Sequence, residues 1–410
     1  MTEYLLSDLL KIKNGRDHKH LEDGEIPVFG SGGIMRYANE SLYEEESILL
    51  PRKGTLDNIQ YTNKPFWTVD TIYYTEVNKV KVDAYYLYHY LKLLDLSNLN
   101  SGTGVPSMTF GAYYGIKISL PELKVQKQIA KVLSDLDAKI EVNNKINQEL
   151  EALAKTIYDY WFVQFDFPDQ NGKPYKSSGG KMVYNEELKR EIPEGWNEGK
   201  FGEYATVSSG YAFKSSNWQT KGCPVLKIKD ITEEGKVNTS DLAYVSTEIA
   251  KKANRFNSKE GDVIIAMTGA TIGKFAIIPD DDYLINQRVG LYSLGKERLR
   301  RLPFLYSSLK QEYFRLQVFK IGSGAAQPNI SGEQLDNIPL IFPKEDLIKK
   351  YNQKFEPFFK KILENQKENQ KLAALRDWLL PMLMNGQVTV GEAKEELGMV
   401  AEDNAKYGEV

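Results

Sequence analysis

The stretch "KIEVNNKINQELEAL" (residues 139–153) occurs a second time in the chain, as "KILENQKENQKLAAL" (361–375). Nine of the fifteen positions are identical in the two copies: Lys139, Ile140, Asn143, Lys145, Asn147, Gln148, Leu150, Ala152 and Leu153. The same displacement of 222 residues superimposes four further marks: Ser101-Gly102 on Ser323-Gly324, Pro106 on Pro328, Ile116 on Ile338, and Pro121 on Pro343. One unbroken register over about fifty residues indicates an internal duplication of the chain.

The parts of the chain that precede these copies repeat more loosely. A displacement of 195 places Gly15 on Gly210, and one of 197 places Pro27-Val28 on Pro224-Val225. The stretch "SILLPRKGTLDNIQY" (47–61) resembles "DVIIAMTGATIGKFA" (262–276). The chain is therefore predicted to alternate a variable domain with a near-identical helix, twice.

The near-identical segments are predicted to form long helices over residues 122–162 and 344–380. Pro121 and Pro343 stand just before them, where the missing N–H of proline costs nothing. Apolar residues recur at steps of three and four. They are Ile129, Val132, Leu136, Ile140, Leu150, Leu153, Ile157 and Tyr160 in the first helix, and Leu347, Tyr351, Phe355, Phe358, Ile362, Leu372, Leu375 and Leu379 in the second. Each helix would be roughly 60 Å long, and pairing as a coiled coil would bury both stripes.

Asparagines interrupt both apolar stripes at matching places. Asn143 and Asn147 interrupt the first, and Asn365 and Asn369 the second. A polar residue on a coiled-coil seam costs stability but fixes the register of the two helices. A bend of the stripe toward solvent is the alternative, and the register role is favoured.

The variable segments are rich in tyrosine, isoleucine, valine, glycine and threonine, in short runs that are typical of strands. The first of them contains "PVFGSGGI" (27–34), whose glycines could indicate a phosphate or cofactor loop. Its partner in the repeat, "PVLKIKDI" (224–231), has no glycine, and no strong helix follows the first stretch. A cofactor loop should open a helix, so a strand and a turn are predicted instead.

Composition narrows the functional class further. The 410 residues carry a net charge of −3, so no overall excess of positive charge indicates a nucleic-acid partner, although local patches remain possible. A single cysteine, Cys223, fits a reducing cytoplasm, and three histidines are too few for a convincing zinc site. The N-terminus lacks a signal peptide, and no apolar run is long enough for a membrane span. A cytoplasmic protein without a metal is expected.

The sequence contains no convincing catalytic motif. "GATIGK" (269–274) has one residue too few for a P-loop and no Ser or Thr after its lysine. Pro168-Asp169 followed by Glu187-Leu188-Lys189 has the outline of a nuclease motif, but it spans a connector rich in glycine, serine and lysine. Neither an amino-methylation motif nor a Ser/His/Asp constellation is present. The chain offers recognition surfaces, with no catalytic residues assigned.

Several stretches resemble one known family, the specificity (S) subunit of type I restriction–modification systems. "PRKGTLDNIQYTNKPFWTVDTIYY" (51–74) resembles one form of its target-recognition domain, and "GDVIIAMTGATIG" (261–273) with "INQRVG" (285–290) resembles another. "YDYWFVQFDFP", "GKPYKSSGGKM" and "IPEGW" resemble the segment that joins the halves, and "LLPMLMNGQV" (379–388) the end of the distal helix. The sequence departs from strict symmetry at the loop "SGTGVPSM", which matches "SGAAQPNI" only in part.

The resemblance implies an α+β fold in which two β-rich target-recognition domains are separated by two long antiparallel coiled-coil helices, with a pseudo-twofold internal repeat. The implied division has six parts: target-recognition domain 1 (1–120), central spacer helix (121–165), linker (166–195), target-recognition domain 2 (196–342), distal spacer helix (343–386) and C-terminal tail (387–410).

The implied function is that of a non-catalytic reader of double-stranded DNA. Each recognition domain would read one half of a bipartite, asymmetric site, and the helices would set the gap between the halves and dock the methylation subunits. Two methylation (M) subunits would bind S-adenosylmethionine and methylate adenine N6, whereas restriction (R) subunits would bind ATP and Mg²⁺. This chain itself would hold no cofactor. A coiled-coil adaptor whose β-rich domains bind protein or carbohydrate, and a self-contained nuclease, are the alternatives.

Nine residues are expected to face DNA because of their place in the matching segments and their hydrogen-bonding capacity. They are Lys53, Asn58 and Tyr61 in the first domain, and Lys214, Lys227, Thr271, Lys274, Gln287 and Arg288 in the second. Ordinary surface polarity is the alternative for each. The sequence alone does not separate base contacts from phosphate contacts.

Overall fold

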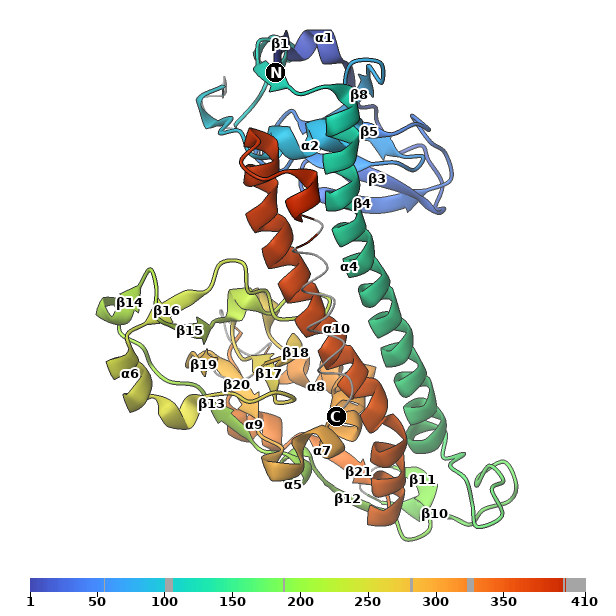
Figure 1. Ribbon diagram of the computed structural model, residues 1–410. Helices are drawn as coiled ribbons and strands as arrows, with labels where there is room; N and C mark the ends of the chain where they lie inside the picture. The colour runs from blue at the N-terminus through green and yellow to red at the C-terminus, as the bar shows by residue number, and fades with distance from the viewer. Residues whose placement is uncertain are drawn as a thin grey trace. The chain divides into compact units, whose positions relative to one another are not determined.

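The computed structural model describes residues 1–54, 56–99, 106–186, 189–280, 283–322, 328–393 and 395. It comprises two compact units. Unit 1 consists of Met1–Lys139 with Leu372–Val410, and unit 2 of Ile140–Lys371. Each unit contains a β-rich domain and portions of two long helices, α4 (Leu123–Tyr158) and α10 (Glu345–Asn385) (Figure 1). The predicted α+β class is confirmed.

Unit 1 builds its described strands into three small sheets, with orders β1-β9, β2-β8-β5-β6 and β4-β3-β7. The strands are β1 (Thr2–Leu5), β2 (Leu10–Asn14), β3 (Ile26–Gly30), β4 (Gly33–Ala38), β5 (Ser47–Pro51), β6 (Gln60–Thr62), β7 (Trp67–Thr68), β8 (Ile72–Val77) and β9 (Lys117–Leu120). The helices are α1 (Leu6–Leu9), α2 (Ala84–Lys92), α3 (Phe110–Tyr114) and a 3₁₀ turn at Ser97–Leu99. "PVFGSGGI" forms β3, a turn and the start of β4, as predicted.

Unit 2 has the corresponding sheets β12-β21, β13-β20-β17-β18 and β14-β16-β15-β19, together with a hairpin β10-β11 in the connector. The strands are β10 (Met182–Asn185), β11 (Arg190–Pro193), β12 (Asn197–Lys200), β13 (Val207–Ser209), β14 (Trp218–Gln219), β15 (Cys223–Leu226), β16 (Ala243–Val245), β17 (Val263–Ala266), β18 (Phe275–Ile277), β19 (Leu284–Ile285), β20 (Val289–Tyr292) and β21 (Pro339–Phe342). The α-helices are α5 (Phe201–Tyr204), α6 (Thr247–Lys252), α7 (Arg298–Leu309), α8 (Glu312–Gly322) and α9 (Gly332–Asp336).

The loose sequence repeats correspond to repeated contacts. Val28 of β3 pairs in parallel with Trp67, and Val225 of β15 pairs in parallel with Leu284. A Cβ on Gly15 would lie 2.0 Å from the carbonyl oxygen of Val69, and one on Gly210 would lie 2.2 Å from that of Ile285. Both glycines are therefore required by the same close approach of two backbones.

A second repeated contact closes the loop after β5 and after β17. Gly54 and Gly269 have φ of +89° and +78°, in the left-handed region that favours glycine. Their N–H groups donate to the carbonyl oxygens of Pro106 and Pro328, each at 3.0 Å. The displacement that superimposes the two prolines in the sequence is thus confirmed by a hydrogen bond in each unit.

The long helices run antiparallel in unit 2. Asn143 donates from Nδ2 to Oδ1 of Asn369 at 2.9 Å, and Asn365 donates to Asn147 at 2.8 Å. A twofold operation that exchanges residue n with n + 222 converts one of these pairs into the other. Asn143, Asn147 and Asn365 are buried, so the alternative of a bend toward solvent is wrong at these three positions.

The predicted apolar stripes are wrong in part. Leu153 and Tyr160 are 47% and 37% exposed, whereas Ala154 and Tyr158 are buried. In the second helix Phe359 is fully buried and takes the place expected for Phe358. Steps of three and four fit more than one face of a helix. The buried seam includes the asparagines. A stripe predicted from apolar residues alone leaves them out, because they are polar.

The two β-rich domains rest on the helices through different chemistry. In unit 2, Tyr158, Phe162 and Tyr351 pack edge to face or tilted against one another, and Tyr158 and Phe162 also pack against Phe304 of α7. In unit 1, Asp137 of α4 accepts hydrogen bonds from Tyr85 of α2 and Arg376 of α10. We call the first set the aromatic seat and the second the polar seat.

Candidate nucleic-acid interface

Four backbone segments of unit 2 converge on one edge of its domain, which we call rim 2 (residues 210–214, 226–227, 267–269 and 286–288). The N–H of Gln287 donates to the carbonyl of Tyr211 at 3.0 Å, and that of Asn286 to Leu226 at 3.0 Å. The N–H of Met267 donates to the carbonyl of Arg288 at 3.1 Å. Strand order and turns therefore gather side chains that are far apart in the sequence.

Rim 2 carries four of the six residues predicted in this domain. Lys214, Gln287 and Arg288 are exposed, and Lys227 is half-buried. Each can donate hydrogen bonds to a phosphate or to the acceptor edge of a base. The structure brings together a basic and amide-bearing edge that composition, with its net charge of −3, conceals.

Aromatic side chains that the sequence reasoning missed support this edge. Trp218 packs against Phe213, and Phe213 against Tyr211, with ring centroids 5.3 Å and 4.9 Å apart. The Lys227 ammonium lies 3.6 Å from the centroid of the Trp218 ring. Bases stack on such rings and cations bind them. The available signal was the run of aromatic residues after Gly210 in "GYAFKSSNW".

Unit 1 has the matching edge, rim 1 (residues 15–20, 52–54 and 69–71). The N–H of Arg16 donates to the carbonyl of Thr68 at 2.8 Å, and those of Arg52 and Lys53 donate to Thr71 at 2.9 Å and 3.2 Å. Lys53, predicted from the sequence, is exposed here.

Three further cations on rim 1 were missed: Arg16, Lys19 and Arg52. Arg16 and Lys19 are exposed, and Arg52 is half-buried. The displacement of 195 that aligns Gly15 with Gly210 also aligns Lys19 with Lys214. Extending that alignment by four residues would have found Lys19 from the sequence alone.

Asn58 supports rim 1 from within. Its side-chain amide donates to the carbonyl of Ser31 at 2.7 Å, and Gln60 donates to that of Gly30 at 3.0 Å. The N–H of Ser31 reaches Oγ1 of Thr71 at 3.3 Å. The glycine-rich turn of "PVFGSGGI" is therefore attached to rim 1, where it shapes the edge.

Tyr61 lies away from rim 1. Its hydroxyl donates to Glu46 at 3.0 Å, and its ring packs against Tyr85 and Tyr88 of α2. Burial, the first cause, and the adjacent Glu46 carboxylate raise the pKa of Tyr61 well above its usual value. These contacts connect β6 to α2, and a DNA contact by Tyr61 stays a prediction.

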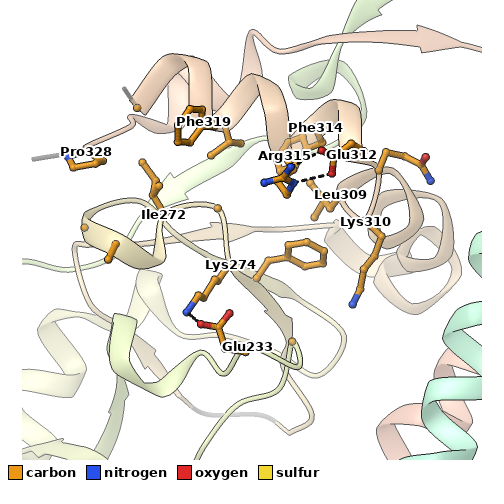
Figure 2. Close-up of a pocket in the computed structure, with 18 of the residues that line it drawn as sticks. Glu233, Ile272, Lys274, Leu309, Lys310, Glu312, Phe314, Arg315, Phe319 and Pro328 are labelled. Atoms are coloured by element: carbon orange, nitrogen blue, oxygen red, sulfur yellow. Dashed lines mark hydrogen bonds and ion pairs between the residues drawn. The ribbon is translucent and has the colours of Figure 1, made fainter. Parts of the chain in front are cut away.

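Thr271 and Lys274 lie in the loop that continues from the rim 2 segment 267–269. Thr271 ends a 3₁₀ turn, Gly269–Thr271, and Lys274 forms an ion pair with Glu233. Figure 2 shows Lys274 in a pocket of about 520 Å³ between the 269–275 loop and α8, with Ile272 and Phe319 nearby. Their prediction as DNA contacts remains untested.

A pocket of about 500 Å³ occupies the matching place in unit 1. Gly54, Leu91, Lys92 and Pro106 line it, where Gly269, Leu309, Lys310 and Pro328 line the pocket of unit 2. The repeat thus extends to the space behind each rim. The unequal loops of residues 101–105 and 323–327 lie outside the described residues.

Two features typical of other protein classes are absent from the described ranges. No group of three or more His, Cys, Asp or Glu side chains there could hold a metal ion. None of the helices described combines the length and the apolar character needed to cross a membrane. Of the nuclease-like pattern, Glu187 and Leu188 lie outside the described residues.

Comparison with known families identifies the duplicated fold. A family model described as "Type I restriction modification DNA specificity domain" matches residues 1–152 and 193–374. The chain belongs to this family. The two matched segments correspond to the two copies of the internal repeat, so each β-rich domain with its following helix is one specificity domain.

Curated relatives carry the same description. The MjaVIII specificity subunit of Methanocaldococcus jannaschii is 29% identical over 91% of this chain and 85% of its own length. The HindI specificity subunit of Haemophilus influenzae is 25% identical over 73% of this chain and 74% of its own length. The crystal structure of the S subunit from M. genitalium has a TM-score of 0.53 at 17% identity, covering 93% of this chain and 95% of that one, and supports the fold. Recognition of DNA sequence is the function of this specificity family.

Proposed function

We propose that the two domains read the two halves of one bipartite, asymmetric DNA site. The observation that carries this is the repetition of one topology with different side chains on its edge. Rim 1 carries Arg16, Lys19, Arg52 and Lys53, whereas rim 2 carries Lys214, Lys227, Gln287 and Arg288. Equivalent scaffolds with different donors would place two readers in related orientations on duplex DNA and give them different target sequences.

The chain itself acts as a non-catalytic subunit in this proposal. Adenine-N6 methylation, with S-adenosylmethionine, belongs to two methylation subunits, and ATP- and Mg²⁺-dependent cleavage belongs to restriction subunits. The target adenine must leave the base stack to reach a partner's active site. A subunit that holds the flanking base pairs and contributes no reactive group fits that division, in a complex that acts in the cytoplasm.

The spacer helix α4 supports docking of a methylation subunit. Val142, Ile146 and Leu153 of α4 are 52%, 39% and 47% exposed and follow one another at steps of four and seven, and Tyr160, 37% exposed, lies seven residues further on in the π-helical turn Asp159–Val163 that continues α4. Such a spacing is that of a coiled-coil seam. A helix of the methylation subunit packed along this stripe would bury side chains that the chain alone leaves in water.

Exchange of a recognition domain tests the two-reader proposal. Residues 196–340 would be replaced by the corresponding segment of another specificity subunit, and the complex with its methylation subunits would be expressed. Methylome sequencing should then show one half-site changed and the other intact. A change in both halves, or in neither, would contradict independent readers.

Salt dependence tests DNA binding against the alternative of a protein- or carbohydrate-binding adaptor. Neutralisation of phosphates makes affinity for duplex DNA fall steeply as salt rises. Binding of the unaltered complex to its methylated motif should therefore weaken between 50 and 200 mM salt by at least about tenfold. An adaptor of the alternative class would show no retention on duplex DNA at any salt concentration.

A further inference from the structure

Lys227 differs from the other cations of rim 2 because its position is fixed. Its ammonium lies 3.6 Å from the centroid of the Trp218 ring. Within the described part of the chain, no carboxylate forms an ion pair with it, whereas Lys229, two residues on, pairs with Asp241. Lys227 is therefore held by a ring face and not by an ion pair, with the Asp230 and Asp241 carboxylates near enough to interact with its charge.

The residue that holds it is fixed by strand pairing of its backbone and by apolar packing of its ring. Trp218 begins β14, where it pairs with Val245 of β16. It packs against Phe213 at a centroid separation of 5.3 Å and against the buried cluster that contains Val225 and Leu284. The Lys227 ammonium lies over this Trp218 ring. A tryptophan is the strongest ring partner for a cation among the aromatic side chains.

The positions of unit 1 that align with this pair carry neither a cation nor a ring, and the cation over a ring that rim 1 does present is Arg52, 5.8 Å from the centroid of the Tyr73 ring. The displacement of 197 places Lys227 on Gly30, in the glycine-rich turn, and the displacement of 195 places Trp218 on Asp23. The pair therefore belongs to the chemistry that distinguishes the two readers and is absent from the scaffold they share. A feature present in one reader alone is expected to affect one half-site alone.

We infer that Trp218 holds Lys227 to read a guanine in the half-site of unit 2, through O6 and N7 on the major-groove edge. This inference rests on the proposed function. A phosphate is satisfied by a mobile ammonium at many positions, whereas base readout needs a donor at one position. Holding a lysine before binding also reduces the side-chain entropy that is lost on binding.

The test is the methylation motif of the complex with Lys227→Met, which keeps the length of the side chain and removes its charge. We expect discrimination at a single G·C pair of one half-site to fall by roughly 5- to 150-fold, with the other half-site unchanged. Trp218→Leu should relax the same base pair. The double variant should be no worse than Lys227→Met, because the two residues act as one unit.

Two controls make the result specific. Lys229→Met removes a neighbouring exposed cation that is paired with Asp241, and it should leave the motif unchanged. Lys227→Arg keeps a donor for guanine and should retain the G·C preference. Weakening of all sequences alike by Lys227→Met, with a shallower salt dependence, would assign Lys227 to a phosphate and overturn the inference.

The outcome is separable from failure of the proposed function. If the unaltered complex methylates a bipartite motif and Lys227→Met changes no base of it, this inference is wrong and the two-reader proposal stands. If the unaltered complex has no bipartite motif, the two-reader proposal itself is wrong. Trp218→Phe, which keeps a ring beneath the ammonium, should retain the motif even if Trp218→Leu does not fold.

Discussion

Unit 1 and unit 2 share a topology but are attached to the long helices by different interactions. The polar seat of unit 1 centres on Asp137, which bonds to Tyr85 and Arg376. The twofold operation places Asp137 on Phe359 and Arg376 on Ala154, both members of the apolar core of unit 2. The comparison shows that the repeat conserves backbone contacts, whereas the side chains that anchor each domain vary.

The few positions that the units share are those where backbone approaches backbone. Gly15 and Gly210 leave room for a carbonyl oxygen, and Gly54 and Gly269 adopt a left-handed φ. No other residue type satisfies the first requirement without moving a strand. Side-chain contacts can be replaced by others of similar volume or polarity. The glycines and prolines are therefore the same in both copies of the repeat, whereas the side-chain contacts differ.

The largest expected effect comes from those shared glycines. Gly15→Ala would place a Cβ 2.0 Å from the Val69 carbonyl oxygen, and Gly210→Ala would place one 2.2 Å from that of Ile285. Each change should cost about 3 kcal/mol of folding free energy, since two backbones must separate. Denaturant unfolding measures the loss.

Gly32→Ala is the matched control for that pair, because nothing lies within 4 Å of the added Cβ. Its stability should differ little from that of the unaltered chain. Equal stability of Gly15→Ala and Gly32→Ala would show that the close approach in unit 1 is not required, and the comparison of the two units would lose its basis.

A loss of folding stability at low pH is the effect of intermediate size, and the part of it that comes from histidine should be confined to unit 1. His89, 4% exposed, lies beside the polar seat with its Nε2 3.9 Å from Asp137, and burial, the largest cause, lowers its pKa to about 4 despite that carboxylate. Lys92 and Arg376 lower it further, and Asp377 opposes them. Because the folded state keeps the ring neutral, its contribution to stability is complete above about pH 6.5 and is lost as pH falls toward 4.

The loss should approach about 1.4 kcal/mol per pH unit at its steepest. Hydrogen exchange should show that the amides of unit 1 are less protected at pH 4.5 than at pH 7. This loss of protection should disappear in His89→Leu. It should persist in His20→Gln, because the His20 side chain is exposed. Unit 2 contains no histidine. A loss of protection in unit 1 that persists in His89→Leu would assign the acid response to other groups.

The smallest effect sharpens the contrast between the seats. Arg376→Met removes the 2.6 Å ion pair with Asp137, in which both side chains are about 30% exposed, and should cost about 1 kcal/mol. Tyr351→Phe removes two hydrogen bonds of the hydroxyl, to the buried Ala154 carbonyl and with the buried Ser307 hydroxyl, each at 2.8 Å, and should cost about 1–2 kcal/mol.

Salt separates these two changes. The cost of Arg376→Met should shrink in 1 M salt because partly exposed charges are screened, whereas the cost of Tyr351→Phe should not change. Unfolding curves of both variants at low and high salt give the comparison. Equal salt sensitivity would mean that the polar seat of unit 1 is not electrostatic in character.

The sequence determined the duplication, the long helices, the β-rich domains and the matched glycines and prolines. Each of these depends on a local requirement. Some backbone conformations need glycine, proline is accepted at few backbone positions, and a helix or strand imposes a period on its apolar residues. The sequence also identified Lys53, Lys214, Lys227, Gln287 and Arg288 among the residues that the rims present. These residues lie close in the sequence to positions that repeat, so aligning the two halves of the chain locates them.

Only the tertiary structure decided which face of each helix is buried and which polar side chains share an edge. Leu153 and Ala154 are adjacent in sequence, yet the leucine is exposed and the alanine buried, because the seam follows Asn143 and Asn147. Trp218 and Lys227 come together through the β14-β16-β15 order of one sheet. Strand pairing acts between distant residues, and the pattern of any single segment does not specify its partner.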